Sequence, residues 1–399
     1  MEINKKRAFV VLAFGTFVWC FSAALRSNQS VPESQATHGI RAKSESNKPL
    51  VTLTSSNLSG ERMAPEHLCE IGSIPWGMDD IRKELKEFQH AYDRRPVAHS
   101  VSGSNLFHAF AQWCLIRMLQ PQYIIESGTM LGWGTYMLRK AAGCDAHIVV
   151  LSPESPERVG KDRKQKYFID YVGPSTYLTE DKFTDFSDVD WEKVGIDTPA
   201  KKAATLIYFD DHQSGYRRLL EAQRAGFVHA MYDDGYPWPG DNYALKQTCD
   251  RTGVLEDVRA SLNDPGFRPS GKVKKAFAYY DDFANFNSTI SLDQKKCMAD
   301  DMAQRLHTYF EFPPLWHGGF RQQNSAMLPS IQQHSVMSVA DGEKFLSEFE
   351  NPIFHKLKTE DEASKYTFFA YTQMKQPFKK KKDCLSDLKM PAKYRVIRK

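Results

Sequence analysis

The chain has 399 residues, of which 41% are hydrophobic and 12% aromatic, so it can bury a sizeable core and is not disordered throughout. It carries 53 Lys and Arg against 49 Asp and Glu, but ten basic and two acidic residues fall in 375–399, so the other 374 residues sum to −4. A slightly acidic body is not typical of a nucleic-acid-binding protein. A single long apolar run excludes a multi-span membrane protein.

That apolar run lies near the N-terminus. Residues 8–25 carry no charge, and at about 1.5 Å per residue they are just long enough to cross a bilayer core as one helix. Three basic residues at 5–7 precede the run, so the positive-inside rule predicts a cytosolic tail and a lumenal body. Small residues at 22–24 leave a cleaved signal peptide as the alternative. We therefore expect a single-pass type II membrane protein of the Golgi or endoplasmic reticulum, or a secreted protein if the segment is cleaved.

A serine-rich stretch follows. It has eight serines between 27 and 60, no clear periodicity, and glycosylation sequons at Asn28 and Asn57; a third sequon begins at Asn287. These features predict a flexible lumenal stem over 26–65. From the N-terminus, we expect a cytosolic tail 1–7, an anchor 8–25, a stem 26–65, an α/β domain 66–255, a C-terminal part of the domain or substrate lid 256–374, and a basic tail 375–399.

Cysteine usage is compatible with an oxidising lumen. Six cysteines lie beyond the apolar run and allow one to three disulfide bridges, whose pairing the sequence leaves open. Cys114 lies in an apolar helical stretch, so we expect it to be a buried free thiol. The chain has no Cys-x-x-Cys pair and no Cys/His cluster, so a structural zinc site is not expected.

Apolar strands alternate with helices in the body of the chain. This alternation predicts βαβ units and an α/β fold with a doubly wound, mostly parallel sheet covered on both faces. The strand at 123–126 is expected to be central, with 147–151 on one side and 205–209 on the other. The other expected elements are helices 78–92, 104–119, 136–142, 216–225 and 289–306, and strands 229–233, 307–312 and 366–372.

A glycine-rich turn follows the first strand. Its pattern is Glu126-x-Gly128-x-x-x-Gly132-x-Gly134, which differs from the Gly-x-Gly-x-x-Gly fingerprint of dinucleotide-binding proteins. Such a turn leaves backbone amides bare where a helix begins. The pattern resembles class I S-adenosylmethionine-dependent methyltransferases over about 123–243. The resemblance implies a Rossmann-like methyltransferase fold in which these four residues hold S-adenosylmethionine. A purely structural turn of another doubly wound fold is the alternative.

Two acidic pairs follow the strands at 205–209 and 229–233. Carboxylates that converge at one crevice repel each other, and Mg²⁺ or a similar divalent cation relieves that repulsion. The spacing resembles the metal-dependent catechol O-methyltransferase branch of the same family, which implies that Asp211, Asp233 and Asp234 are metal ligands. Helix caps and solvated turns are the alternative for these residues.

The chain also departs from that branch. Ser214 stands where the branch has a lysine base, so His212 is the nearest candidate for the catalytic base, with a structural hydrogen bond as the alternative. The second strand ends at Ser152-Pro153-Glu154, where the family usually has an acidic residue for the cofactor's ribose.

Together these features predict a lumenal, metal-assisted O-methyltransferase that acts on a hydroxyl of a glycan or small molecule. A type II glycosyltransferase with an acidic metal site, or a catalytically silent binding protein of the same fold, is the alternative.

Overall fold

The structure is a computed structural model that describes residues 76–96, 106–211, 213, 215–233, 245, 292–316, 335–351 and 369–377. All of them belong to one compact unit, Pro49–Lys399. The expected anchor and stem lie outside the described residues, as do His212, Ser214 and Asp234. Among the helices that the structure describes, none is both long enough and apolar enough to cross a membrane.

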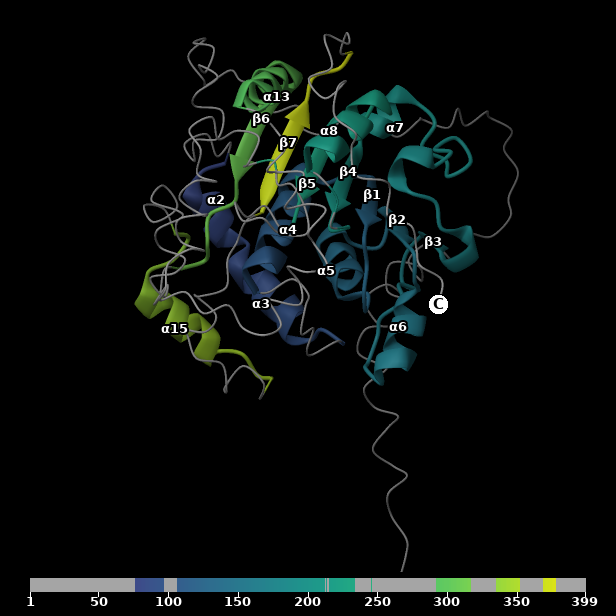
Figure 1. Cartoon of the computed structure of the whole chain (residues 1–399). Helices are drawn as coiled ribbons and strands as arrows, with labels where there is room; N and C mark the ends of the chain where they lie inside the picture. The colour runs from purple at the N-terminus through teal and green to yellow at the C-terminus, as the bar shows by residue number, and fades with distance from the viewer. Residues whose placement is uncertain are drawn as a thin grey trace, which may run out of the picture. The chain divides into compact units, whose positions relative to one another are not determined.

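A seven-stranded sheet organises this unit, with the strand order β3-β2-β1-β4-β5-β7-β6 (Figure 1). The first five strands are parallel, and β7 runs antiparallel to both of its neighbours. β1 lies between β2 and β4, so the expected central strand and its two neighbours are confirmed. The strand bounds are β1 Tyr123–Ser127, β2 His147–Ser152, β3 Ser175–Thr179, β4 Thr205–Phe209, β5 His229–Tyr232, β6 Leu306–Glu311 and β7 Ala370–Met374.

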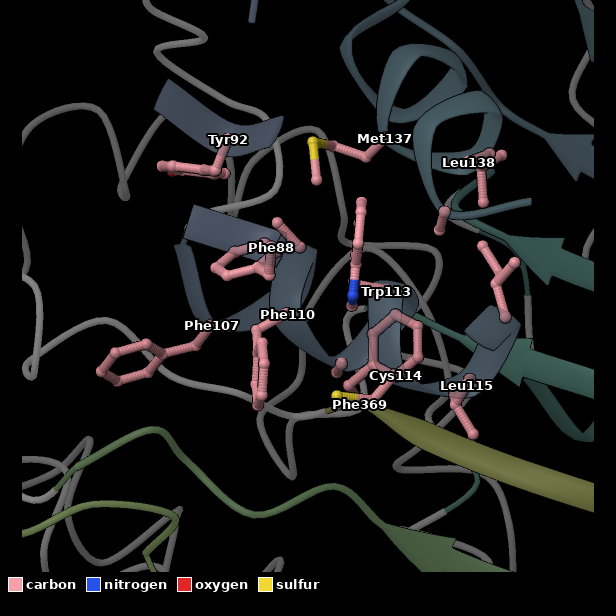
Figure 2. Close-up of a cluster of buried hydrophobic side chains, with 14 of the residues drawn as sticks. Phe88, Tyr92, Phe107, Phe110, Trp113, Cys114, Leu115, Met137, Leu138 and Phe369 are labelled. Carbon is pink, nitrogen blue, oxygen red and sulfur yellow. The ribbon is translucent and has the colours of Figure 1, made fainter. Parts of the chain in front are cut away.

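Helices cover both faces of the sheet, which is why the inner strands are apolar at successive positions. One face, called here the α4 face, shares a hydrophobic core with α3 (Leu85–Asp93), α4 (Leu106–Leu119), α5 (Trp133–Ala142) and α15 (Val339–Ser347). Helix α4 is buried on nearly all sides because it lies between the sheet and other helices. Figure 2 shows aromatic side chains of this core; the rings of Phe88 and Phe110 lie 5.1 Å apart and edge-to-face.

The opposite face, called here the α8 face, lies against α8 (Gly215–Arg224) and the short 3-10 helix η3 (Phe186–Asp188). Phe186 anchors this side, with its ring 5.0 Å from that of Phe209 on β4. The remaining described helices are α2 Met78–Lys83, α6 Pro156–Arg163, η2 Glu180–Lys182, α7 Pro199–Ala203 and α13 Leu292–Arg305. The helix expected over 78–92 is thus two helices, α2 and α3, separated at Glu84.

Three cysteines lie in the described part of the chain. Cys114 is free and buried within α4, as expected from the sequence. Burial raises the pKa of its thiol well above the ordinary value, so the thiol stays protonated and unreactive. Cys144 and Cys297 are both disulfide-bonded.

Candidate functional site

The strand order reverses at β1. From β1 the chain winds outward through β2 to β3, and then returns to β4 on the other side. In doubly wound sheets ligands bind outside the carboxyl ends of the strands at such a switch point. Here the ends of β1 and β4 lie side by side, with Ser127 paired to Phe209 and the amide of Asp210 donating to the Ser127 carbonyl at 2.8 Å. The glycine-rich turn and the first acidic pair therefore meet at this point.

The three glycines of the turn are required by close approach of the protein to itself. Gly128 has φ +96°, and a Cβ atom there would collide with the carbonyl of Asp210. Gly132 has φ +75° and a Cβ atom there would collide with the carbonyl of Phe168. A Cβ atom at Gly134 would lie 2.6 Å from Oε1 of Glu126. Each glycine thus allows another part of the chain to lie in direct contact with the turn.

Glu126 is buried and directed at this helix start. The N-cap of α5 is Gly132, which has no side chain to accept from the first amides of the helix. Glu126 supplies the acceptor instead: the hydroxyl of Thr135 donates to its Oε2 at 2.5 Å, and the Thr135 amide also donates to this carboxyl. Burial raises the pKa of Glu126 from 4.5 to about 8, so the carboxyl is largely protonated at neutral pH. Its role in the structure is to support the turn from below.

Two amides on the outer side of the turn remain available. In the part of the chain that the structure describes, the backbone amides of Thr129 and Met130 donate no hydrogen bond. Both residues are only half-buried. The turn is held from beneath, because the Gly128 amide donates to Leu151 at 2.8 Å and the Ser152 hydroxyl donates to the Thr129 carbonyl at 3.0 Å. A fixed turn with open amides just before a helix can receive an anionic or polar ligand group.

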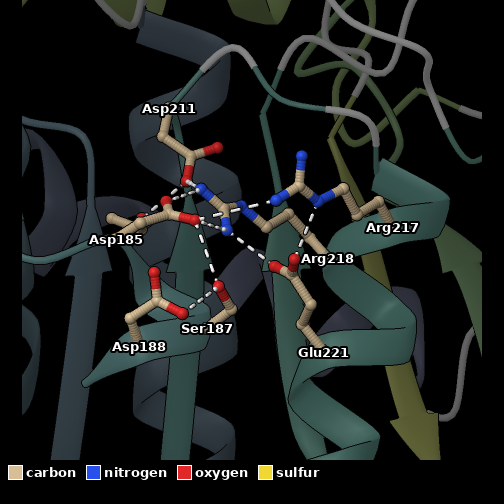
Figure 3. Close-up of polar contacts among 8 residues, drawn as sticks. Asp185, Ser187, Asp188, Asp211, Arg217, Arg218 and Glu221 are labelled. Carbon is tan, nitrogen blue, oxygen red and sulfur yellow. Dashed lines mark hydrogen bonds and ion pairs between the residues drawn. The ribbon is translucent and has the colours of Figure 1, made fainter. Parts of the chain in front are cut away.

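Asp211 lies on the α8 face, in the ion network of Figure 3. Its Oδ2 lies 2.6 Å from Nη2 of Arg218 and accepts from the Ser127 hydroxyl at 2.6 Å. Arg218 also binds Asp185 and Glu221, each at 2.7 Å. Asp211, which was expected to be a metal ligand, is therefore paired with a buried guanidinium.

Asp233 lies on the α4 face. Its Oδ1 lies 2.7 Å from Nδ1 of His108 on α4, and its Oδ2 accepts from the Tyr208 hydroxyl at 2.8 Å. The side chains of His108 and Asp233 are 3% and 5% exposed. His108 was not among the expected site residues. The available signal was a lone histidine in an apolar helix, with the buried Gln112 one turn later.

The structure does not bring Asp211 and Asp233 together. β4 and β5 are in register at Phe209 and Tyr232, so Asp210 is level with Asp233, and Asp211 is one residue beyond. Both residues lie just beyond their strands, and their partners separate them: Asp211 binds Arg218 of α8, whereas Asp233 lies against His108 of α4 on the opposite face. Among the described residues no group of three or more His, Cys, Asp or Glu side chains is suited to hold a metal. Asp234 as a ligand and His212 as a base stay predictions, since both lie outside those residues.

Comparison with known proteins adds no family. No protein-family model matches the chain, and no curated protein matches its sequence.

Two other features lie away from the switch point. Glu154, the candidate for a ribose contact, is exposed and lies 3.8 Å from Arg158 in an ion pair.

A groove of about 630 Å³ opens near the first residues of β1 and β2, Tyr123 and His147. This groove is at the amino ends of the strands, opposite the turn. We place the candidate site at the carboxyl ends because the strand order reverses there and the open amides of the turn lie there.

Proposed function

We propose that the chain is an S-adenosylmethionine-dependent O-methyltransferase that acts on a hydroxyl of a glycan or small molecule. The observation that carries the proposal is the turn after β1: its half-buried Thr129 and Met130 amides stand open at the switch point of a doubly wound sheet. The mostly parallel sheet agrees with the fold that the resemblance of the Glu126–Gly134 pattern implies. The four residues of that pattern are proposed to form the cofactor site, with Glu126 acting from beneath the turn.

The cofactor supplies an electrophilic methyl group when it is bound. The chain's own part is to hold a rigid receptor for it, because a preorganised site loses little entropy when it binds. Glu126 fixes the start of α5, and Arg218 fixes the segment after β4 through Asp211. The two segments that flank the switch point are thus held by buried polar contacts from opposite faces of the sheet.

The compartment is part of the proposal. The disulfide bonds at Cys144 and Cys297 support an oxidising environment, because such bonds persist in secretory compartments and are rare in the cytosol. The apolar run at 8–25 and the sequons that follow support a lumenal body with one N-terminal membrane anchor. We therefore propose that the reaction takes place in the lumen of the Golgi or endoplasmic reticulum.

The geometry gives less support to a glycosyltransferase. That activity needs an acidic pair that holds a metal ion and a sugar diphosphate. Asp211, one member of the acidic pair that directly follows β4, is bound to Arg218 and Ser127.

The experiment is a thermal-shift measurement on the full chain in detergent micelles, with S-adenosylmethionine and with a panel of uridine and guanosine diphosphate sugars. A ligand at about 100 times its Kd stabilises a protein by about 2.7 kcal/mol, which corresponds to a rise of several degrees in Tm. We expect this rise with S-adenosylmethionine alone. A rise with a nucleotide sugar and none with S-adenosylmethionine would replace the proposal with the glycosyltransferase. Cofactor binding with no methyl transfer to any hydroxyl acceptor would indicate the silent binding protein.

A further inference from the structure

Arg218 is a buried cation at the place where the sequence pattern suggests a metal ion. Its side chain is 3% exposed, and three carboxylates surround it: Asp211 at 2.6 Å, and Asp185 and Glu221 at 2.7 Å each (Figure 3). Burial opposes the charge on the guanidinium, but these three carboxylates outweigh burial and raise its pKa further. The group is therefore positively charged at every pH at which the protein is folded.

This cation does for Asp211 what a divalent metal would do. A carboxylate at a strand end needs a positive partner when other carboxylates lie near it. Oδ2 of Asp211 forms an ion pair with Arg218 and accepts a hydrogen bond from the Ser127 hydroxyl. A divalent ion bound to Asp211 would lie within a few Å of the buried guanidinium, and the two positive charges would repel each other strongly.

The second expected ligand is also engaged, and on the other side of the sheet. Both carboxylate oxygens of Asp233 have polar neighbours within the α4 face, His108 at 2.7 Å and Tyr208 at 2.8 Å. For one ion to bind Asp211 and Asp233 together, both sets of contacts would have to break. One carboxylate would also have to turn around the ends of β4 and β5. Mg²⁺ needs near-ideal octahedral oxygen geometry, so this arrangement does not fit it.

We propose that Arg218 is the resident cation at the end of β4, and that the site at the switch point works without a divalent metal. Metal-independent cofactor binding rests on the proposed function, whereas the absence of a shared metal site between Asp211 and Asp233 does not.

The first test measures Mn²⁺ binding to the full chain from the electron paramagnetic resonance signal of free Mn²⁺. We expect that Mn²⁺ does not bind with a Kd below about 1 mM. If Mn²⁺ does bind, Asp211→Asn and Asp233→Asn should leave its affinity unchanged. Binding that either substitution weakens tenfold or more would overturn the proposal.

The second test removes the cation. Arg218→Met removes the arginine partner of Asp211 and leaves Asp185 and Glu221 with Arg217 as their remaining arginine, so Mn²⁺ should now raise the Tm of this variant. Arg218→Lys retains the charge and is the matched control, which should gain no response to Mn²⁺. A folded Arg218→Met variant with no response would contradict the role given to Arg218. If this variant does not fold, the Mn²⁺ measurement on wild type decides the question.

The third test compares S-adenosylmethionine binding in excess EDTA with binding in Mg²⁺. Equal affinities are expected, and binding that requires Mg²⁺ would overturn the proposal. If the cofactor binds under neither condition, the proposed function fails, and the Mn²⁺ measurements still decide whether Arg218 replaces the metal.

Discussion

Gly128 is the residue on which the junction of β1 and β4 depends most. Its φ of +96° suits glycine, and a Cβ atom would also collide with the Asp210 carbonyl. Gly195 is a matched control, because its φ is +88° but nothing lies within 4 Å of the added atom. Gly195→Ala should cost about 1–2 kcal/mol of unfolding free energy, from backbone strain alone. Gly128→Ala should cost roughly 3–5 kcal/mol, since a collision with backbone is added to the strain. Denaturant unfolding measures both, and equal costs would show that the two strand ends are not tightly joined.

Glu126 gives the folded state a pH dependence of known sign. Its pKa is about 8 when folded and 4.5 ordinarily, so the folded state retains a proton that the unfolded state loses. The stability that Glu126 contributes is fully present below pH 4.5, and it is lost as the pH rises to about 8. The loss is at most roughly 5 kcal/mol.

Glu126→Gln should remove this dependence, because glutamine remains neutral and is similar in shape. Wild type and variant should be close in stability near pH 4.5, and the variant should be the more stable near pH 8. Urea unfolding at several pH values measures the difference. Glu154→Gln, at an exposed carboxylate, is the control and should follow wild type. Parallel curves for wild type and Glu126→Gln would mean that Glu126 is ionised in the folded protein.

At the scale of elements, a buried ion pair ties α5 to the segment before β3. Nε of Arg139 donates to Asp170 at 2.7 Å, and the side chains are 3% and 0% exposed. The same guanidinium donates to the carbonyls of Gly143, Ala146 and Pro174. Arg139→Met should cost roughly 3–5 kcal/mol, because it leaves Asp170 charged and buried with its arginine partner removed. Arg158→Met breaks the exposed pair with Glu180 and should cost under about 1 kcal/mol. Similar losses in denaturant unfolding would contradict the importance given to burial.

The strands of the sheet were predictable from sequence, with the exception of β3 at one edge. The strand at 205–209 has the expected bounds, because buried parallel strands are continuous apolar runs between turns. The two C-terminal strands also close the sheet as expected, as β6 and β7. β3 was missed, because it is a half-buried edge strand whose Ser-Thr-Tyr-Leu-Thr sequence lacks an apolar run.

The site was predictable only in part, for a geometric reason. The pattern from Glu126 to Gly134 correctly indicated a turn between a strand and a helix. The pairing of Asp211 with Asp233 depended on register, which the sequence of two separate strands does not contain. A difference of one residue in register directs a side chain to the other face. The partners of both residues, Arg218 and His108, come from helices on opposite faces.

At the scale of the whole molecule, the candidate site depends on both faces of the sheet. The α4 face contributes Glu126 beneath the turn, together with Asp233 and His108, and the α8 face contributes Arg218 with Asp211. Between them, the outer side of the turn offers the open amides of Thr129 and Met130. We propose that S-adenosylmethionine binds at these amides.

Hydrogen exchange followed by mass spectrometry tests whether S-adenosylmethionine binds at this turn. The full chain in detergent micelles is labelled with and without saturating S-adenosylmethionine, and exchange is followed in peptides that cover 127–136. The Thr129 and Met130 amides donate no hydrogen bond within the described structure, so they should exchange fast in the free protein. We expect the cofactor to slow exchange in these peptides more than in those over the groove near Tyr123 and His147. Unchanged exchange at the turn, with the cofactor bound elsewhere or not at all, would contradict it.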